Sequence, residues 1–295
     1  MPTDVHWTTR TVRNQDLALV SCLLNAAAWK HQHLDWLSAM DLVGQQPFLL
    51  ALEGETPVGC LACPPDLPDV AWLRLFAVAP GFSLTRAWER LWAGALALTR
   101  SRGAALAAAL PVIDWLPPLL ERSGFERRSA VVFLEWRGRT PPPGRPCPAV
   151  IRSMRPADLR AIAAVDQYAF GPLWRLSERS LAAALAQAQV ASVAVVDGRL
   201  AGYQISTASA LGAHLARLAV GPEAQGEGVG RALVIDALHA HVQRGFAKVT
   251  VNTQTDNAPA LQLYGGLGFL RTEQQYPIYQ MEVARSEQPS GGISQ

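Results

Sequence analysis

The sequence predicts an α/β fold built from two copies of one domain in tandem. Three observations predict it: segments that repeat at a near-constant distance along the chain, a proline-rich segment between the repeats, and alternating helix and strand patterns. The chain has 295 residues, of which 49% are hydrophobic and 17% are charged, so it is long and apolar enough to bury two cores.

The repeated segments lie 142 to 144 positions apart. VRNQDL at Val12–Leu17 returns as MRPADL at Met154–Leu159, and Val78 falls on Val220 at the same shift of 142. LLERSGFERR, which begins at position 119, returns as LYGGLGFLRT from position 263. A shift this steady along both halves indicates a duplicated domain.

A proline-rich segment, TPPPGRPCP at positions 140–148, separates the two copies. Its prolines exclude a helix interior and a central strand. We therefore predict a first domain over residues 1–139, a linker over 140–149, a second domain over 150–284 and a disordered tail over 285–295.

The apolar pattern of the second copy alternates between helix and strand periodicity. Helices are predicted over residues 157–170, 177–188, 230–245 and 258–268. Strands are predicted over 190–207, which Asp197-Gly198 divides into a hairpin, and over 214–221, 247–254 and 275–283. We expect each copy to form a mixed, mostly antiparallel sheet with one parallel pair of strands. In the second copy this pair is 214–221 and 247–254, which the helix over 230–245 connects.

Charge, hydropathy and cysteine spacing exclude several classes of function. The 26 basic and 24 acidic residues give a net charge of +2 without a long basic run, so we expect no nucleic-acid partner. No apolar run approaches the ~18 to 20 residues that span a bilayer, and the N-terminus lacks the apolar core of a signal peptide. We therefore expect a cytoplasmic protein without a membrane partner. Cys60 and Cys63 lie in an apolar, strand-like run with no second pair at ligand spacing, which predicts buried thiols and no metal.

A loop with three alternate glycines, at positions 226, 228 and 230, lies between a predicted strand and a predicted helix. Such a loop is a ready anion site, because free backbone N–H groups converge there and the helix dipole adds positive charge. The P-loop scheme fails, because Arg231 and Ala232 follow where lysine and serine or threonine are required. The dinucleotide scheme fails as well, because it requires glycine at position 231 and an acidic residue about 20 positions later.

Two blocks of the second copy together resemble the GNAT acetyltransferase superfamily. QGEGVG, from Gln225 to Gly230, matches the pattern Q/R-x-x-G-x-G/A. The second block matches N-x-x-A-x-x-L-Y-x-x-x-G-F at Asn257, Ala260, Leu263, Tyr264, Gly268 and Phe269. The resemblance covers Arg152 to about Val283. It implies acetyl-CoA as a co-substrate, and a sheet in which the two parallel strands splay apart.

The resemblance also implies a role for individual residues. In the loop that begins at Gln225, backbone N–H groups would bind the pyrophosphate, namely those of Gly226, Gly228, Val229, Gly230 and Arg231. Leu218, Ala219 and Val220 would pair with the pantetheine arm, and Asn257 would hydrogen-bond to it. The N–H of Val220 would also donate to the developing oxyanion, and Tyr264 would give a proton to the departing thiolate.

The general base is left open between two alternatives. In the branch that acetylates ribosomal-protein N-termini, a glutamate stands where this chain has Asn252, which cannot accept a proton at neutral pH. In the histone-acetyltransferase branch, a glutamate stands where this chain has His214, whose usual pKa near 6.5 suits a base acting directly or through water. The other alternative is that the chain has no dedicated base and water carries the proton to bulk solvent.

The first copy lacks the residues of the second that would contact the cofactor. Its corresponding loop reads GFSLTRAW, with only Gly81 retained, and Leu120 and Ile113 stand where the second copy has Tyr264 and Asn257. We expect this copy to brace the second or to shape its acceptor pocket, so that deleting residues 1–139 would impair folding, affinity or turnover.

The sequence thus predicts an N-acetyltransferase that acts on a primary amine of a small molecule or a peptide N-terminus, as a monomer or homodimer. Transfer from another acyl-CoA, or a non-catalytic acyl-CoA sensor or scaffold, is the alternative. The acceptor is expected to lie between two aromatic segments, and the residues proposed to line it are Tyr168, Trp174, Arg175, Tyr276 and Tyr279.

Overall fold

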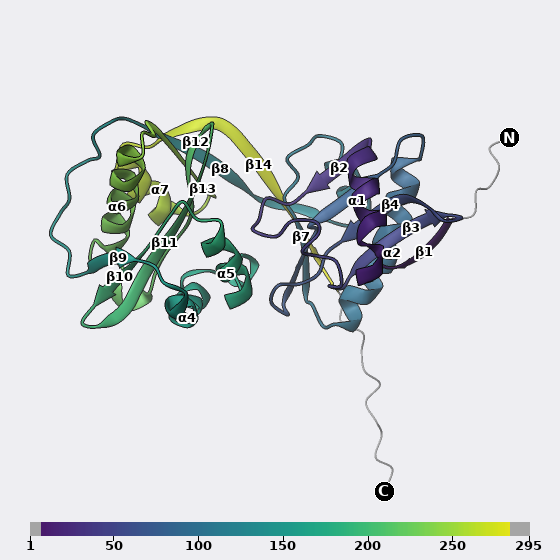
Figure 1. The fold of residues 1–295 in the computed structure, drawn as a ribbon, viewed down its shortest axis with the longest axis horizontal. Coiled ribbons are helices and arrows are strands. Elements are labelled where there is room, and N and C mark those ends of the chain that lie inside the picture. The colour runs from purple at the N-terminus through teal and green to yellow at the C-terminus, as the bar shows by residue number, and fades with distance from the viewer. Residues whose placement is uncertain (1–6, 284–295) are drawn as a thin grey trace, which may run out of the picture. The chain divides into compact units, whose positions relative to one another are not determined.

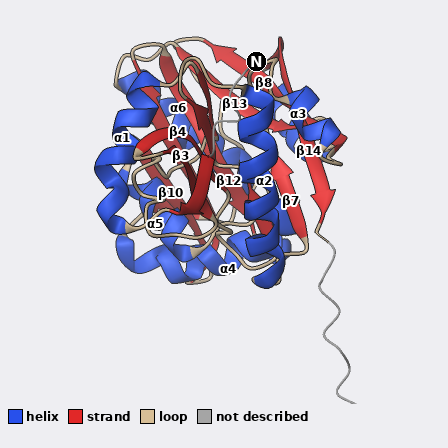
Figure 2. Ribbon diagram, turned by 90° about the vertical axis from the view of Figure 1, so that its right-hand side faces the viewer, coloured by secondary structure: helices blue, strands red, loops and turns tan. Residues whose placement is uncertain are grey.

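The computed structural model describes residues 7–283, whose helices and strands are drawn in Figure 2 and which divide into two compact units (Figure 1). Among the described residues, the first unit comprises 7–127 and 279–283, and the second comprises Arg128–Ile278. The tail predicted over 285–295 lies outside the described residues. No helix within residues 7–283 is both long and apolar enough to cross a membrane.

Helices and strands follow one another in a similar order in both halves of the chain. The first half forms β1 (Trp7–Thr11), α1 (Leu17–Ala26), β2 (Trp29–Gln32), β3 (Phe48–Glu53), β4 (Thr56–Ala62), β5 (Val70–Trp72), β6 (Leu75–Val78), α2 (Leu84–Ser101), β7 (Leu106–Ala109), α3 (Pro117–Arg122) and β8 (Glu126–Arg137). The second half forms β9 (Val150–Ser153), α4 (Leu159–Ala169), α5 (Glu178–Ala186), β10 (Val190–Val196), β11 (Arg199–Ser209), β12 (Gly212–Val220), α6 (Val229–Gln243), β13 (Lys248–Gln254), α7 (Ala258–Gly265) and β14 (Leu270–Glu282). Residues 138–149 between β8 and β9 contain no helix or strand.

The sheet of the second unit runs in the order β14-β8-β13-β12-β11-β10-β9. The ladders from β9 to β12 and between β13 and β8 are antiparallel, whereas β12 and β13 are parallel with α6 between them in the chain. Helices α6 and α7 share a core with this sheet that includes Leu215 of β12 and Val251 of β13. Helix α4 lies on the opposite face, where its Asp166 meets Arg217 of β12 (Figure 1).

The last strand of each half extends into the unit of the other half. β8 precedes the proline-rich segment, yet its residues Val131–Arg137 pair with β13 in the second unit. β14 begins in the second unit, and its end at Tyr279–Glu282 pairs with β7 in the first unit. Each unit therefore contains part of a strand that the other half of the chain supplies: β8 in the second unit and the end of β14, paired with β7, in the first.

Matching polar contacts in the two units reflect the sequence repeat. Asp16 accepts two hydrogen bonds from Arg10, at 2.6 and 2.7 Å, and Asp158 accepts two from Arg152, each at 2.8 Å. Each arginine and each aspartate is displaced by 142 positions between the copies. In both copies the aspartate also caps the turn before the first helix by accepting a backbone N–H three residues earlier.

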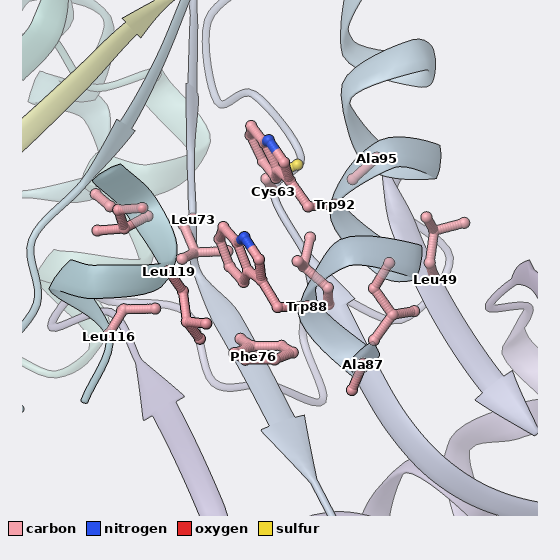
Figure 3. Close-up of a cluster of buried hydrophobic side chains, with 14 of the residues drawn as sticks. Leu49, Cys63, Leu73, Phe76, Ala87, Trp88, Trp92, Ala95, Leu116 and Leu119 are labelled. Atoms are coloured by element: carbon pink, nitrogen blue, oxygen red, sulfur yellow. The ribbon is translucent and has the colours of Figure 1, made fainter. Parts of the chain in front are cut away.

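The first unit has apolar cores on both faces of its sheet, which runs β1-β3-β4-β6-β2. Helix α2 covers one face, where Trp88 and Trp92 stack with ring centroids 5.5 Å apart and Trp88 meets Phe76 edge-on (Figure 3). Helix α1 covers the other face. The predicted burial of Cys60 and Cys63 is confirmed, and burial raises the pKa of each thiol to about 12.

Candidate active site

The glycine loop lies between β12 and α6, as the sequence predicts. Gly226 and Gly228 have backbone φ angles of +84° and +81°, in the left-handed region that glycine adopts readily because it has no Cβ. Gly228 is the N-cap of α6, which begins at Val229. A Cβ at Gly226 would meet nothing within 4 Å, so this part of the loop borders open space.

The start of α6 presents backbone donors that have no partner within the helix. The N–H of Ala232 donates to the carbonyl of Gly228 at 3.0 Å, so the preceding N–H groups of Val229, Gly230 and Arg231 fall in the unpaired first turn. These groups and the helix dipole together attract an anion. The Arg231 side chain is directed elsewhere, because its Nη1 donates to the carbonyl of Gly266 at 3.1 Å.

Gly230 is the point where three segments of the second unit meet. A Cβ there would lie 3.5 Å from Cγ2 of Val220 on β12 and 3.5 Å from Cδ2 of Leu263 on α7. Tyr264 follows Leu263 directly. The structure therefore brings together the end of β12, the glycine loop and the helix that carries Tyr264.

One edge of β12 is open beside the loop. β12 pairs with β11 as far as Val220, but its ladder with β13 covers only Ala213–Leu215. The N–H of Gly221 donates toward β11, to the carbonyl of Ala201 at 2.8 Å. Because successive residues of an antiparallel strand direct their N–H groups to opposite sides, the N–H of Val220 points to the open edge. Gln225 closes the turn by donating to the carbonyl of Val220 at 3.0 Å.

Helix α7 carries Asn257 and Tyr264 at its two ends. Asn257 is the N-cap: its Oδ1 accepts the N–H of Ala260 at 3.2 Å, and its Nδ2 donates to Gln254 at 3.2 Å. Tyr264 is 5% exposed, and burial raises its pKa above the usual value. Its hydroxyl has no hydrogen-bond partner among residues 7–283.

His214 is held on β12 by residues of β13. Its Nδ1 lies 2.8 Å from Oγ1 of Thr250, whose hydroxyl donates to the carbonyl of Ala213 at 3.3 Å. Because Thr250 has one hydroxyl proton, it accepts the N–H of His214, and the ring's lone pair is then on Nε2. Burial lowers the pKa of His214, while hydrogen bonds with Asn252 and Thr250 act in the opposite direction. The imidazole is therefore neutral near pH 7. Its neighbour Asn252 stands at the other position where a branch of the family carries a glutamate.

A buried ion pair that the sequence analysis missed lies close to these residues. Asp166 of α4 is fully buried and accepts hydrogen bonds from Arg217 of β12, at 2.5 and 2.9 Å, and from the hydroxyl of Tyr203, at 2.5 Å. Arg217 also donates to the carbonyl of Trp174 at 2.7 Å, and the N–H of Leu176 donates to Asp166 at 2.8 Å. This network ties the segment between α4 and α5 to β12. The sequence contains one signal of this pair, an aspartate on a largely apolar helix. Because carboxylates are rarely buried without a partner, such an aspartate indicates a buried cation nearby.

The residues expected to line the acceptor site divide between the two units. Tyr276 lies in the second unit, edge-on to Phe133 with ring centroids 5.8 Å apart. Tyr279 belongs to the first unit, where its hydroxyl donates to Glu121 at 2.7 Å, so its expected place in this wall is corrected. The reason is that β14 crosses into the first unit after Ile278. Tyr168 is 77% exposed.

Comparison with known proteins identifies the family. The profile described as the Acetyltransferase (GNAT) family matches residues 157–269. Over 119 residues the chain is 30% identical to the [ribosomal protein bS18]-alanine N-acetyltransferase of Escherichia coli (strain K12), covering 40% of this chain and 79% of that enzyme. The chain belongs to the GNAT acetyltransferase family. Membership places it among the acyltransferases of EC class 2.3.1 and implies acetyl-CoA as the co-substrate.

Two further likenesses extend this assignment. The chain is 46% identical over 54 residues to the mycothiol acetyltransferase of Rhodococcus opacus (strain B4), which is 18% of each chain, so it spans about a fifth of the length of that relative. The whole fold resembles a solved tandem GNAT protein from the clavulanic acid biosynthesis pathway, with a TM-score of 0.64 and 18% identity over 96% of this chain and 100% of that one. The tandem arrangement of α/β domains is therefore shared with a known structure.

Proposed function

We propose that the second unit moves an acetyl group from acetyl-CoA to a primary amine of a small molecule or of a peptide N-terminus. The observation that carries this proposal is the convergence at Gly230 of Val220, the glycine loop and the helix of Tyr264. An anion site alone would suit many ligands. An anion site beside an open strand edge and a buried phenol suits an extended ligand with phosphates at one end and a reactive group at the other.

The residues that would hold the coenzyme lie along one continuous path. The N–H groups of Gly226, Gly228, Val229, Gly230 and Arg231 would bind the pyrophosphate, with Gln225 fixing the turn. Leu218, Ala219 and Val220 would pair with the pantetheine arm along the open edge. The end of the β12–β13 ladder at Leu215 supports a splay between these strands beyond that residue. Asn257 retains one amide hydrogen and one lone pair beyond its capping bonds, which an arm along this edge could use.

The chemistry requires stabilisation of two developing charges, and acetyl-CoA would supply the activated thioester. The N–H of Val220, directed to the open edge, would donate to the carbonyl oxygen as it becomes an oxyanion. Tyr264 would donate its hydroxyl hydrogen to the departing sulfur. Because burial raises the pKa of Tyr264 and a thiol has a pKa near ~8.5, full proton transfer is uphill. Tyr264 therefore stabilises the thiolate chiefly as a hydrogen-bond donor.

His214 is the proposed base, and it would act through water. It lies six residues before Val220 on β12, which is at most about 20 Å of strand at ~3.3 Å per residue. A side chain cannot close that distance to an amine held at Val220 without intervening water. The neutral ring suits the acceptance of a proton from such a chain when water takes the place of Asn252 as a hydrogen-bond partner of the ring. Proton loss along water to bulk solvent without His214 is the alternative.

We further propose that the first copy, residues 1–139, binds no coenzyme and that the second copy, residues 150–284, carries the only site. In the first unit β2 pairs with β6 from Trp29↔Val78 to Gln32↔Leu75. Val78 is the repeat counterpart of Val220. A strand of the chain itself thus occupies the edge that stays open in the second unit, which supports a single acetyl-CoA site per chain.

A thiol-release screen with acetyl-CoA tests the proposal. The acceptors should include free amines, amino acids, aminoglycosides, a peptide that begins with alanine and the acceptor of mycothiol acetyltransferases, since two relatives carry those names. Tyr264→Phe should slow turnover about tenfold or more while the Kd of acetyl-CoA stays the same. If acetyl-CoA raises the melting temperature but no amine releases thiol, the protein is a sensor and the proposal is wrong.

A further inference from the structure

Strand β8 places a residue of the first copy next to the candidate base of the second unit. Phe133 is the register partner of Asn252 in the β8–β13 ladder. Its ring is stacked with His214 at a centroid distance of 6.4 Å and an interplanar angle of 30°, and it meets Tyr276 edge-on at 5.8 Å. All four residues lie within the second unit.

The face on which Phe133 lies follows from strand alternation. Val132 and Leu134 are buried in the core beneath α6 and α7, so Phe133 between them points to the opposite face. His214 points to that face too. It hydrogen-bonds to Thr250 and Asn252, whose side chains lie on the face of β13 opposite its buried residues. Phe133 is only half-buried there, which leaves an aromatic surface beside the imidazole.

The charge on this face is already balanced within the protein. Glu135 lies two residues after Phe133 and therefore shares its face. Its carboxylate pairs with Arg137 and, at 3.2 Å, with Nζ of Lys248. A second ammonium group of a polyamine would have to displace these cations, whereas an apolar or aromatic group would pack on the exposed ring without such a cost.

We propose that Phe133 determines acceptor specificity by contacting the part of the acceptor remote from its reactive nitrogen, and that the preferred acceptor is a primary amine bearing an apolar or aromatic group. This inference rests on the proposed function of the second unit. It gives the first half of the chain a direct role in the site, because the strand that carries Phe133 precedes the linker. Phe133 is a specificity residue, and it takes no part in proton transfer.

The test compares 8-phenyloctylamine with spermidine as acceptors for the full-length protein, by thiol release, because the alkyl chain lets the phenyl ring reach Phe133 from an amine held at Val220. Wild type should use 8-phenyloctylamine at least about tenfold better in kcat/KM. Phe133→Ala should lower that value about tenfold through KM, with the Kd of acetyl-CoA unchanged and spermidine little affected. Phe133→Leu, which keeps apolar bulk, should fall between the two. Phe246→Ala, which removes a half-buried ring from the α6 side of the sheet, is the matched control and should preserve the preference.

Equal effects of Phe133→Ala on both amines, or a wild-type preference for spermidine, would overturn the inference. Calorimetric binding of 8-phenyloctylamine to the protein saturated with CoA separates this outcome from failure of the proposed function. If the wild type binds this amine, Phe133→Ala does not, and no amine is turned over, the pocket assignment stands and the proposed acetyltransferase activity is wrong. No binding to wild type, or equal binding to Phe133→Ala, would refute the pocket assignment itself.

Discussion

Replacement of Arg217 by methionine should destabilise the second unit strongly. Arg217 makes two hydrogen bonds to Asp166 and one to the carbonyl of Trp174, and its guanidinium lies 3.7 Å over the ring of Phe170. Methionine keeps much of the length of the side chain but none of its charge. Asp166, which is fully buried, would then lose its charged partner and keep neutral donors such as the hydroxyl of Tyr203 and the N–H of Leu176.

The expected loss follows from the burial of the pair. Removing one partner of a buried ion pair leaves an uncompensated charge and costs about 3 to 5 kcal/mol of unfolding free energy. Arg217→Lys should lose less, because an ammonium restores the charge but cannot bond to Asp166 and the Trp174 carbonyl with the same fork. Arg152→Met is the matched control. It breaks another arginine–aspartate pair with two hydrogen bonds, Arg152 with Asp158, in which the arginine side chain is 37% exposed and the aspartate is not fully buried, so it should lose less.

Hydrogen exchange is the suitable assay, because Trp136 and Trp174 are the only tryptophans of the second unit and fluorescence reports mainly on the first. Urea titration followed by mass spectrometry should show early loss of protection over residues 159–176 and 212–220 in Arg217→Met. A loss as small as that of Arg152→Met would refute the view that this network fixes the segment between α4 and α5.

Two other substitutions test the glycine loop and a buried histidine. Gly228→Ala should cost about 1 to 2 kcal/mol through its left-handed backbone and raise the Kd of acetyl-CoA about tenfold or more. Gly245→Ala, strained alike just past the opposite end of α6, should leave the Kd unchanged. His31 is buried and donates from Nε2 to the carbonyl of Leu73, and burial lowers its pKa to about 4. Because the unfolded chain binds this proton below about pH 6.5, stability is present above that pH and falls toward pH 4, by about 2 kcal/mol between pH 7 and pH 5. His31→Gln, which can keep the hydrogen bond, should remove the His31 share of this dependence in urea unfolding, while His33 and His241, whose pKa values burial also lowers, keep theirs.

Each of these expectations has a clear contrary result. An unchanged Kd in Gly228→Ala would mean that the loop does not contact the coenzyme. Equal Kd increases in Gly228→Ala and Gly245→Ala would mean that strain, rather than position, matters. Unfolding of the wild type and of His31→Gln with the same pH dependence would show that this histidine does not couple protonation to folding.

Local features of the site were predictable because they depend on local chemistry. The glycines at 226 and 228 are required by their left-handed backbone, and a strand, a glycine loop and a helix in succession determine their place. The repeat was predictable because both copies retain contacts such as Arg10 with Asp16 and Arg152 with Asp158. These interactions join residues close in sequence, so periodicity and spacing report them.

The exchange of the last strands was not predictable from the sequence. The pattern of β8 shows that alternate residues are buried, but it does not say which half of the chain buries them. Phe133 was therefore missed as a neighbour of His214, and Tyr279 was assigned to the wrong unit. Asp166 and Arg217 were missed for a similar reason, because they are 51 residues apart and meet only when α4 packs on β12.

The stoichiometry of coenzyme binding tests the central claim, that one of the two copies carries the acetyl-CoA site, most directly. Isothermal titration of the full-length protein with CoA should give one site per chain, with a Kd that Gly228→Ala raises. The pairing of β2 with β6 predicts that no second site appears at higher concentration. Two sites per chain, or one site that Gly228→Ala leaves unchanged, would contradict this account.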